Sequence, residues 1–349
     1  MTEHELRQSF PENHVITDCR GKASVMVYIR KFYLDEVIDG ASHTLHPAFV
    51  ADGEEKDGVY ISKFQNVLLD GCAYSLPGLD PATEIDFDTA VRSCADKGEG
   101  FHLMTAMEWG AIALWCQKNG WLPYGNNGMG KDIREERSSA RISFYDEEKG
   151  ICRVATGTGS VEWSHNRRAD GIYDLNGNVW EWSGGIRLVF GELQLLSDNA
   201  SDPYAQAPDS EAWRAVDGRT GALLVPNGSG TTENSVKLDF VQGAWQYVSD
   251  AVSDSSERAR FCDFSEVSAH ASVCRSAREL LIALGLLGCG NSDGYGGVSL
   301  YANNGKAERM LFRGGRWGQG MNAGLFKTCF DDPRTYRGAA VGFRCAYYG

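Results

Sequence analysis

The most distinctive stretch of this chain reads YDLNGNVWEW, at residues 173–182. Gly177 and Asn178 suit a tight turn, because both residue types adopt a positive φ at low cost. Trp180 and Trp182 follow the turn, and each brings a large apolar area that can anchor a core poor in regular structure. The stretch therefore predicts a turn that leads into a core segment anchored by both tryptophans.

Two helices are predicted upstream of this stretch. Residues 86–96 (DFDTAVRSCAD) carry apolar side chains at helical spacing, and Gly98 supplies a stop. Thr105 and Glu108, in TAMEW, form a T-x-x-E capping box for a second helix that ends at Gly120. Both helices lie in the first third of the chain.

The rest of the chain is predicted to be rich in loops and poor in strands. Residues 24–38 and 58–69 have the partial alternation of strands, whereas residues 123–177 are rich in Gly, Asn and Asp. The segment 193–300 is rich in Ser, Asp, Gly and Ala, with one helix predicted at about 276–287. Glycine pairs beside aromatic residues predict short strands and tight turns in the last fifty residues. This mixture favours an α+β domain over a parallel α/β sheet.

Three segments, in this order, resemble the formylglycine-generating-enzyme superfamily. They are GFHLMTAMEWGAIALW at 100–115, YDLNGNVWEW at 173–182, and the RGGRW and GFRCA motifs within 311–346. The resemblance implies an α+β, C-type-lectin-like fold that is loop-rich, with its termini close together. It divides the chain into an N-terminal strand-rich segment at 1–50 and a C-type-lectin-like domain at 51–349, with a long insertion at about 193–300.

The chemistry of that superfamily needs a pair of active cysteines, which bind copper, shortly after the RGGS[YW] motif. Here the first cysteine after Trp317 is Cys329, which comes later than the pattern requires, although Cys329 and Cys345 could still meet in space. No GxSxG elbow supports hydrolase chemistry either. We therefore expect a protein that is not an enzyme, and an oxidase of the formylglycine-generating type stays open as the alternative.

The C-terminal segment more closely resembles the variable region of diversity-generating-retroelement target proteins, which phages and bacteria encode. The match runs through RGG at 313–315, NAG at 322–324 and GFRCA at 342–346, and it implies a variable region at about 313–346. Mapped residue by residue, the resemblance assigns ligand-binding, diversified positions to Arg316, Gly318, Gln319, Cys329, Asp331, Asp332, Tyr336, Gly338 and Ala340.

Between Arg334 and Gly342 the mapped positions fall at every second residue, which predicts that their side chains share one face of an extended segment. Gln319 departs from the pattern, because adenine mutation of an AAC codon never yields glutamine. Plain structural roles stay open for the mapped residues. The glycines and the alanine could serve turns, Cys329 could be core, and the two aspartates could cap or solvate a loop.

The resemblance implies a ligand-binding protein at a phage tail or tail-fibre tip, which recognises a protein or glycan on a bacterial cell surface. We expect a virion component assembled in the cytoplasm, or a cytoplasmic protein if it is not virion-associated. A tail-fibre protein or a second copy of the chain is the expected structural partner. Acidic residues outnumber basic ones by 47 to 34, and the net charge of −13 makes nucleic acid an unsuitable partner. The chain has no long apolar run and no basic, apolar N-terminus, so we expect neither membrane insertion nor a secretory signal.

Other residues carry structural expectations. The resemblance makes Asn178 and Glu181 weak candidates for holding a structural calcium ion, although two hard oxygens are too few alone. No other cofactor is expected. Arg313 and Arg344 are candidates for buried, fork-shaped hydrogen bonds to carbonyls that a strand-poor core leaves unpaired. The ten cysteines are scattered without a CxxC pair, which indicates mostly reduced thiols.

Overall fold

The computed structural model describes residues 1–197, 199, 202–289 and 295–349. The remaining positions, 198, 200–201 and 290–294, fall in the predicted insertion and lie outside the described residues. The described α-helices are α1 (Glu3–Ser9), α2 (Leu34–Val37), α3 (Phe87–Ala95), α4 (Ala106–Lys118) and α5 (Arg275–Ala283). Short 3-10 turns are η1 (Pro47–Phe49), η2 (Val161–Trp163), η3 (Pro203–Gln206), η4 (Phe264–Glu266) and η6 (Gly320–Asn322).

One sheet joins the two ends of the chain. Its five antiparallel strands lie in the order β1 (His14–Thr17), β2 (Ala23–Arg30), β5 (Gly58–Ser62), β23 (Cys345–Tyr347) and β8 (Phe101–Leu103). The C-terminal strand β23 therefore lies between β5 and β8. Strands from residues 1–50 and from residues 51–349 share this sheet.

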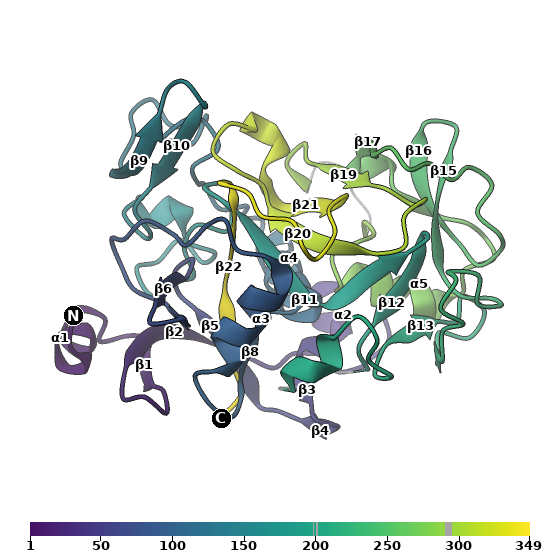
Figure 1. Cartoon of the computed structure of the whole chain (residues 1–349), viewed down its shortest axis with the longest axis horizontal. Coiled ribbons are helices and arrows are strands. Elements are labelled where there is room, and N and C mark those ends of the chain that lie inside the picture. Colours follow the sequence, from purple (N-terminus) through teal and green to yellow (C-terminus); the bar gives the residue numbers. More distant parts are fainter. Residues whose placement is uncertain (198, 200–201, 290–294) are drawn as a thin grey trace.

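A second sheet holds twelve strands and has β11 (Trp180–Val189) at its centre (Figure 1). On one side of β11 follow β20 (Arg309–Gly314), β21 (Gly324–Phe330), β19 (Ser299–Ala302) and β17 (Arg260–Asp263). On the other side follow β12 (Glu192–Leu195), β15 (Lys237–Val241), β16 (Ala244–Val248) and β18 (Ser268–Ala269). Attached to these are β13 (Arg214–Val216), β14 (Leu223–Leu224) and β22 (Val341–Phe343), the last parallel to β11.

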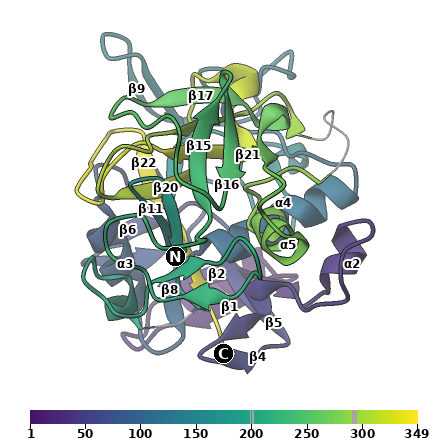
Figure 2. The ribbon, with the colours of Figure 1, turned by 90° about the vertical axis from the view of Figure 1, so that its right-hand side faces the viewer.

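Three small hairpins complete the described strands. They are β3 (Val50–Ala51) with β4 (Glu54–Glu55), β6 (Val67–Leu69) with β7 (Cys72–Tyr74), and β9 (Ile142–Asp146) with β10 (Ile151–Val154). The β15–β16 hairpin, which belongs to the insertion, faces the viewer in Figure 2. Within the described residues, no helix combines the length and the apolarity needed to cross a bilayer.

The two early helices are confirmed, and the second has the capping box expected from the sequence. The carboxylate of Asp86 accepts from the backbone N–H of Thr89 at 2.8 Å, which caps α3. Thr105 and Glu108 form a reciprocal capping box on α4. The indole of Trp109 is buried on α4 and donates to the carbonyl of Leu325 in β21 at 2.7 Å. Helix α4 is therefore fixed against the second sheet.

Other expectations need correction. The segment 24–38 is strand only as far as Arg30, and α2 follows. The segment 58–69 contains two strands, β5 and β6, instead of one. Helix α5 stops at Ala283, shortly before Gly285, which has a φ of +63°.

The prediction of a strand-poor body is wrong, because the insertion contributes strands to both sides of the second sheet. These strands have two to five residues each, so the alternation along any one of them is too short to reveal a strand. The fold class is nevertheless confirmed. Two sheets with few helices and extensive loops make an α+β fold, and the long insertion and the two chain ends in one sheet agree with the C-type-lectin-like arrangement that was expected.

Candidate functional site

Seven of the nine mapped residues line a single pocket of about 340 Å³. They are Arg316, Gln319, Cys329, Asp331, Asp332, Tyr336 and Ala340. The other lining residues are Trp180, Phe261, Ser299, Tyr301, Phe312, Asn322, Lys327 and Val341. We call this cavity the variable-face pocket.

The variable-face pocket lies where β20 and β21 pair and where β22 returns to β11. Strand β21 lies between β20 and β19, and the first half of β11 lies between β20 and β22. The loop 331–340 connects β21 to β22 and is tied to the sheet by its backbone. Within that loop the carbonyl of Asp332 accepts from the N–H of Met310 at 3.0 Å, and the carbonyl of Ala340 accepts from the N–H of Trp180 at 2.8 Å.

The expected alternation between Arg334 and Gly342 is not what brings the mapped residues together. Residues 331–340 form turns and irregular backbone, not a strand. Asp332, Tyr336 and Ala340 nevertheless line the same pocket, because the loop leaves from one strand of the sheet and returns as another. The predicted alternation is therefore absent, and the path of the loop brings three of these residues to one pocket.

Two mapped residues lie outside the pocket lining. Gly318 is exposed, and a Cβ added there would meet the Sδ of Met129 at an ordinary 3.6 Å. Gly338 lies against the ring of Tyr336, whose hydroxyl oxygen would be 2.8 Å from an added Cβ. A side chain is thus sterically accepted at position 318, whereas at position 338 it requires Tyr336 to move.

Aromatic rings form much of the pocket wall. Phe312 is buried, and its ring centroid lies 6.0 Å from that of Tyr336 in an edge-to-face arrangement and 6.1 Å from that of Trp180. Phe261 and Tyr301 stack with centroids 6.2 Å apart, and Phe261 is 62% exposed. An exposed phenylalanine beside a pocket offers apolar area to a ligand.

Charged groups of both signs also face the pocket. Burial, with the neighbouring carboxylate of Asp331, raises the pKa of Asp332 to about 6. Lys327 is 3% exposed, and its Nζ donates to Ser299 Oγ at 2.5 Å and to Asn322 Oδ1 at 2.8 Å. Burial lowers the pKa of Lys327 to about 8, so the amine loses its proton more easily than an exposed lysine.

Gln319 and Cys329 differ from the other mapped residues in the pocket. The side-chain oxygen of Gln319 accepts from the backbone N–H of Arg316 at 2.9 Å, so this glutamine shapes its own turn. Cys329 is 6% exposed inside β21, and burial raises the pKa of its thiol to about 12. Of the mapped side chains, Arg316, Asp331, Asp332 and Tyr336 are the polar ones that are partly exposed in the pocket without such an intrachain role.

The two tryptophans of the WEW motif have different environments. Trp182 is 1% exposed, its Nε1 donates to the carbonyl of Ile85 at 2.8 Å, and its ring packs against Phe87 and Phe312. Trp180 is only partly buried, and its ring lines the variable-face pocket. The expectation that both rings are core anchors is therefore correct for Trp182 alone.

Asn178 and Glu181, the candidate calcium ligands, already have protein partners. Asn178 has a φ of +61°, and its side-chain oxygen accepts from the N–H of Val154 at 2.9 Å and from Asn126 at 3.1 Å. Both oxygens of Glu181 accept from Arg344, and one also accepts from Gln65. The side-chain oxygens of these two residues are therefore already engaged by protein donors. Among the described residues, no three His, Cys, Asp or Glu side chains gather as a metal site either.

Arg313 and Arg344 make the buried carbonyl contacts that were expected of them. Arg313 donates to the carbonyls of Leu284 and Gly285, the second at 3.0 Å, and burial lowers its pKa to about 9. Arg344 donates to the carbonyls of Ser62 and Tyr173 at 2.8 and 2.9 Å, in addition to Glu181. All ten cysteines are free thiols.

Some pocket residues were missed from the sequence. Phe261 and Tyr301 come from β17 and β19, which belong to or border the insertion, and nothing in their local sequence indicates a pocket. Lys327 could have been found, because it is a single cation within the apolar strand sequence GLFKTCF.

No family model and no curated protein matches the chain. The solved structures that are similar to it include two that match over nearly the whole length. Treponema denticola variable protein 1 has a TM-score of 0.34 and 11% identity, and the similarity covers 96% of this chain and 98% of that chain. PvdO from Pseudomonas aeruginosa has a TM-score of 0.32 and 13% identity, with the same coverage of 96% and 98%. At these values neither similarity bears on ligand or chemistry, which have to come from the pocket itself.

Proposed function

We propose that this chain is a non-enzymatic ligand-binding protein whose variable-face pocket is diversified by a retroelement. The observation that carries the proposal is the convergence of seven mapped residues on one pocket. The resemblance assigns these positions from the sequence pattern alone, and such a pattern contains no information about where a cavity lies. Three separate pieces of chain, around residues 316–319, 329–332 and 336–340, supply them.

A diversified surface needs a scaffold that does not depend on the varying side chains. Here the scaffold residues of the same segment are buried away from the pocket. Arg334 forms ion pairs with Glu308 and Asp88, each at 2.7 Å, and Phe343 is fully buried. Arg316, Asp331 and Tyr336, in contrast, have side chains that are partly exposed. Tyrosine supports such a role, because it contributes contact area at a low entropic cost.

We place this activity at a phage tail or tail-fibre tip, where the pocket recognises a protein or glycan on a bacterial cell surface. In this proposal the chain is assembled into a virion in the cytoplasm, with a tail-fibre protein or a second copy of itself as structural partner. The C-terminal sequence resemblance supports this setting, since it is to target proteins of phage and bacterial retroelements.

The decisive variant replaces Asp331, Asp332 and Tyr336 together with alanine. We expect the stability to fall by no more than about 0.5 kcal/mol per site, because these side chains are not core. Fluorescently labelled wild-type protein is incubated with a panel of bacterial strains, and the strain that it labels should no longer be labelled by the triple variant. Arg334→Ala is the contrasting variant, which should lose stability first.

Labelling that persists in a folded triple variant would assign the ligand to another face. A genomic test is independent of the ligand. A repeat beside the gene that differs from the 313–346 coding sequence mainly at adenines supports diversification, and its absence contradicts it. The enzyme alternative has its own test, since stoichiometric copper binding with oxidation of a CxPxR peptide would replace the binding proposal by an oxidase.

A further inference from the structure

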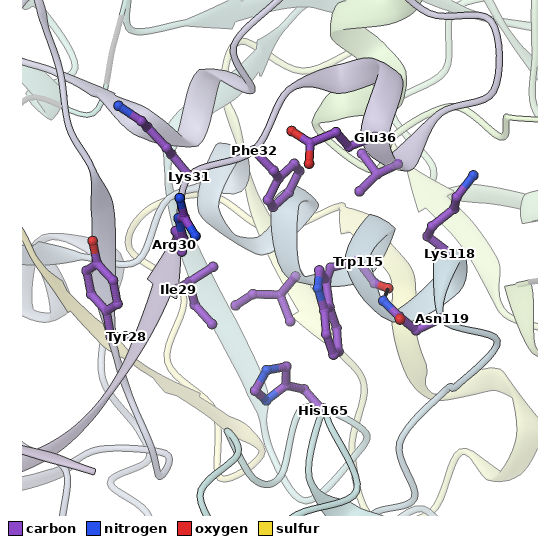
Figure 3. A pocket seen from close by; sticks show the side chains of 12 residues that line it. Tyr28, Ile29, Arg30, Lys31, Phe32, Glu36, Trp115, Lys118, Asn119 and His165 are labelled. Carbon is purple, nitrogen blue, oxygen red and sulfur yellow. Dashed lines mark hydrogen bonds between the residues drawn. The ribbon is translucent and has the colours of Figure 1, made fainter. Parts of the chain in front are cut away.

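A second pocket, of about 450 Å³, lies on another part of the molecule (Figure 3). It is lined by Tyr28–Phe32, at the end of β2, by Glu36 and Val37 of α2, by the C-terminal half of α4, and by His165. We call it the α4 pocket. It shares no lining residue with the variable-face pocket.

His165 places a hydrogen-bond donor at the wall of the α4 pocket. The residue is 5% exposed, and its Nδ1 accepts from the backbone N–H of Ile172 at 2.8 Å. Burial lowers the pKa of His165 to about 3, so the ring is neutral at ordinary pH. A neutral imidazole whose Nδ1 accepts must carry its proton on Nε2. Among the described residues, none accepts that proton.

His46, another buried histidine, has a partner for each of its ring nitrogens. His46 has the same lowered pKa of about 3, and its Nδ1 accepts from the N–H of Ala48 at 3.1 Å. Its Nε2 donates to the carbonyl of Ala283 at 3.1 Å. Both nitrogens of His46 are thus paired within the protein, whereas His165 has one donor left over. His165 lines the pocket, so a ligand or a water there can accept from this donor.

An aromatic ring and apolar side chains lie beside this donor. The rings of Trp115 and His165 are 5.4 Å apart between centroids, and Figure 3 shows them next to each other at one side of the pocket. Ile29, Ile112 and Phe32 add apolar lining. Trp115 is partly exposed, so its face is open to a ring of a bound molecule.

Three cations and one carboxylate line the pocket, and one of the cations makes no ion pair within the described residues. Lys31 binds Glu55 and Asp57 at 2.7 and 2.8 Å, and Lys118 binds Asp39 at 2.6 Å. Arg30 has no ion pair within the described part of the chain. The carboxylate of Glu36 is held by the capping box of α2, where it accepts from the N–H of Tyr33 at 2.8 Å. The guanidinium of Arg30 is therefore the charge that is free to meet a ligand.

We propose that the α4 pocket binds a small ring-containing carboxylic acid. The ring lies against Trp115, an acceptor atom of the ligand takes the Nε2 proton of His165, and the carboxylate meets Arg30. Aromatic acids and sugar acids share this chemistry. The proposal does not depend on the function assigned to the variable-face pocket.

The test uses phenylacetate and glucuronate as acids, with phenylacetamide and glucose as their uncharged counterparts. The readout is the Nε1–H signal of Trp115 in an NMR spectrum, identified by its loss in Trp115→Phe. We expect at least one acid to shift this signal in a saturable way, and its uncharged counterpart to bind about tenfold more weakly.

Arg30 is exposed, so Arg30→Gln should leave the fold intact and reduce the affinity for the acid to that for the uncharged counterpart. The matched control is Arg137→Gln, an exposed arginine outside both pockets, which should leave the affinity unchanged. Replacing Asp331, Asp332 and Tyr336 should have no effect here. The proposal is overturned if neither acid shifts the Trp115 signal, or if Arg30→Gln and Arg137→Gln change the affinity equally. Binding of phenylacetate alone, glucuronate alone or both supports it and identifies the source of the acid.

Discussion

Glu181 and Arg344 form a bidentate ion pair inside the protein, with Nε and Nη2 of the arginine 2.9 and 2.8 Å from the two carboxylate oxygens. Neither side chain is more than 2% exposed. The pair joins the WEW motif of β11 to the GFR motif at the C-terminus, and Arg344 extends the link to the carbonyls of Ser62 and Tyr173. Three distant parts of the sequence thus meet at one guanidinium.

Removing one partner of this ion pair should strongly reduce the stability of the protein. Arg344→Met leaves the carboxylate of Glu181 buried without its cation, and we expect a loss of about 3–5 kcal/mol in the free energy of unfolding. Urea denaturation measures it. The double variant Glu181→Gln with Arg344→Met should lose less than the two single variants combined, since it removes both charges. Additive losses would show that the two side chains are not energetically coupled.

Substitutions of the two tryptophans of the motif should have different effects on stability and on ligand binding. Trp182→Ala empties a fully buried site and should cost about 3–5 kcal/mol. Trp180→Ala removes a half-buried pocket wall and should cost less, on the order of 1–2 kcal/mol, while weakening ligand binding. Thermal melting and cell labelling measure the two effects. Equal destabilisation by both changes would mean that Trp180 is a core residue after all.

Gln319 should behave as a structural residue of the variable region. Gln319→Ala deprives the backbone N–H of Arg316 of its acceptor and should cost about 1 kcal/mol. Gln319→Glu keeps an acceptor at that position and should be close to neutral. Asp331→Ala, a mapped position without such a bond, serves as the comparison in the same denaturation assay. If Gln319→Ala leaves the stability unchanged, Gln319 has no structural role and belongs with the variable positions.

The pH dependence of stability should report on Asp332. Its pKa in the folded protein, about 6, lies above the ordinary value for aspartate, so the folded state holds the proton more tightly than the unfolded state. Asp332 therefore stabilises the fold at low pH, and this contribution is lost as the pH rises through about 4 to 6. The stability of Asp332→Asn relative to wild type should increase over that window and then level off.

Asp174, whose pKa burial also raises to about 6, contributes with the same sign in both proteins and cancels in this difference. The exposed Asp209→Asn is the control for loss of a carboxylate at the surface. A stability difference between wild type and Asp332→Asn that does not change with pH would contradict the shifted pKa.

Calcium should leave the protein unaffected. The oxygens of Asn178 and Glu181 are already accepting protein hydrogen bonds, so adding calcium or a chelator should not move the melting temperature. A bound ion at a hundred times its Kd would add about 2.7 kcal/mol, which is easily detected. A rise with calcium that is abolished in Asn178→Ala would restore the metal site at the turn.

Prediction from the sequence was most successful where a residue type has one predominant structural role. The capping box of Thr105 and Glu108, the positive-φ pair Gly177 and Asn178, and the buried Arg344 were predicted and are observed. Each depends on local backbone geometry or on the cost of an unpaired buried group, and both are visible in a single sequence.

What sequence could not supply was the pairing of distant short strands. The wall that Phe261 and Tyr301 add to the variable-face pocket depends on β17 and β19 joining β21, and no local pattern records that contact. Trp180 was misjudged for a related reason. Alternation places it on the same side of β11 as Trp182, but only the course of the loop 331–340 determines how far each ring is covered.

Lys327 has a consequence for any set of proteins built on this face. Its amine is held by Ser299 and Asn322 on the pocket floor, with Trp180 and Phe312 alongside, and none of these residues belongs to the mapped set. Diversification would change the mapped residues at the rim of the pocket and leave these floor residues unchanged. Every variant of this protein would then present the same cation and the same rings to its ligand. The ligands of all variants would therefore share one chemical class, and the mutated residues would determine which member of that class each variant binds.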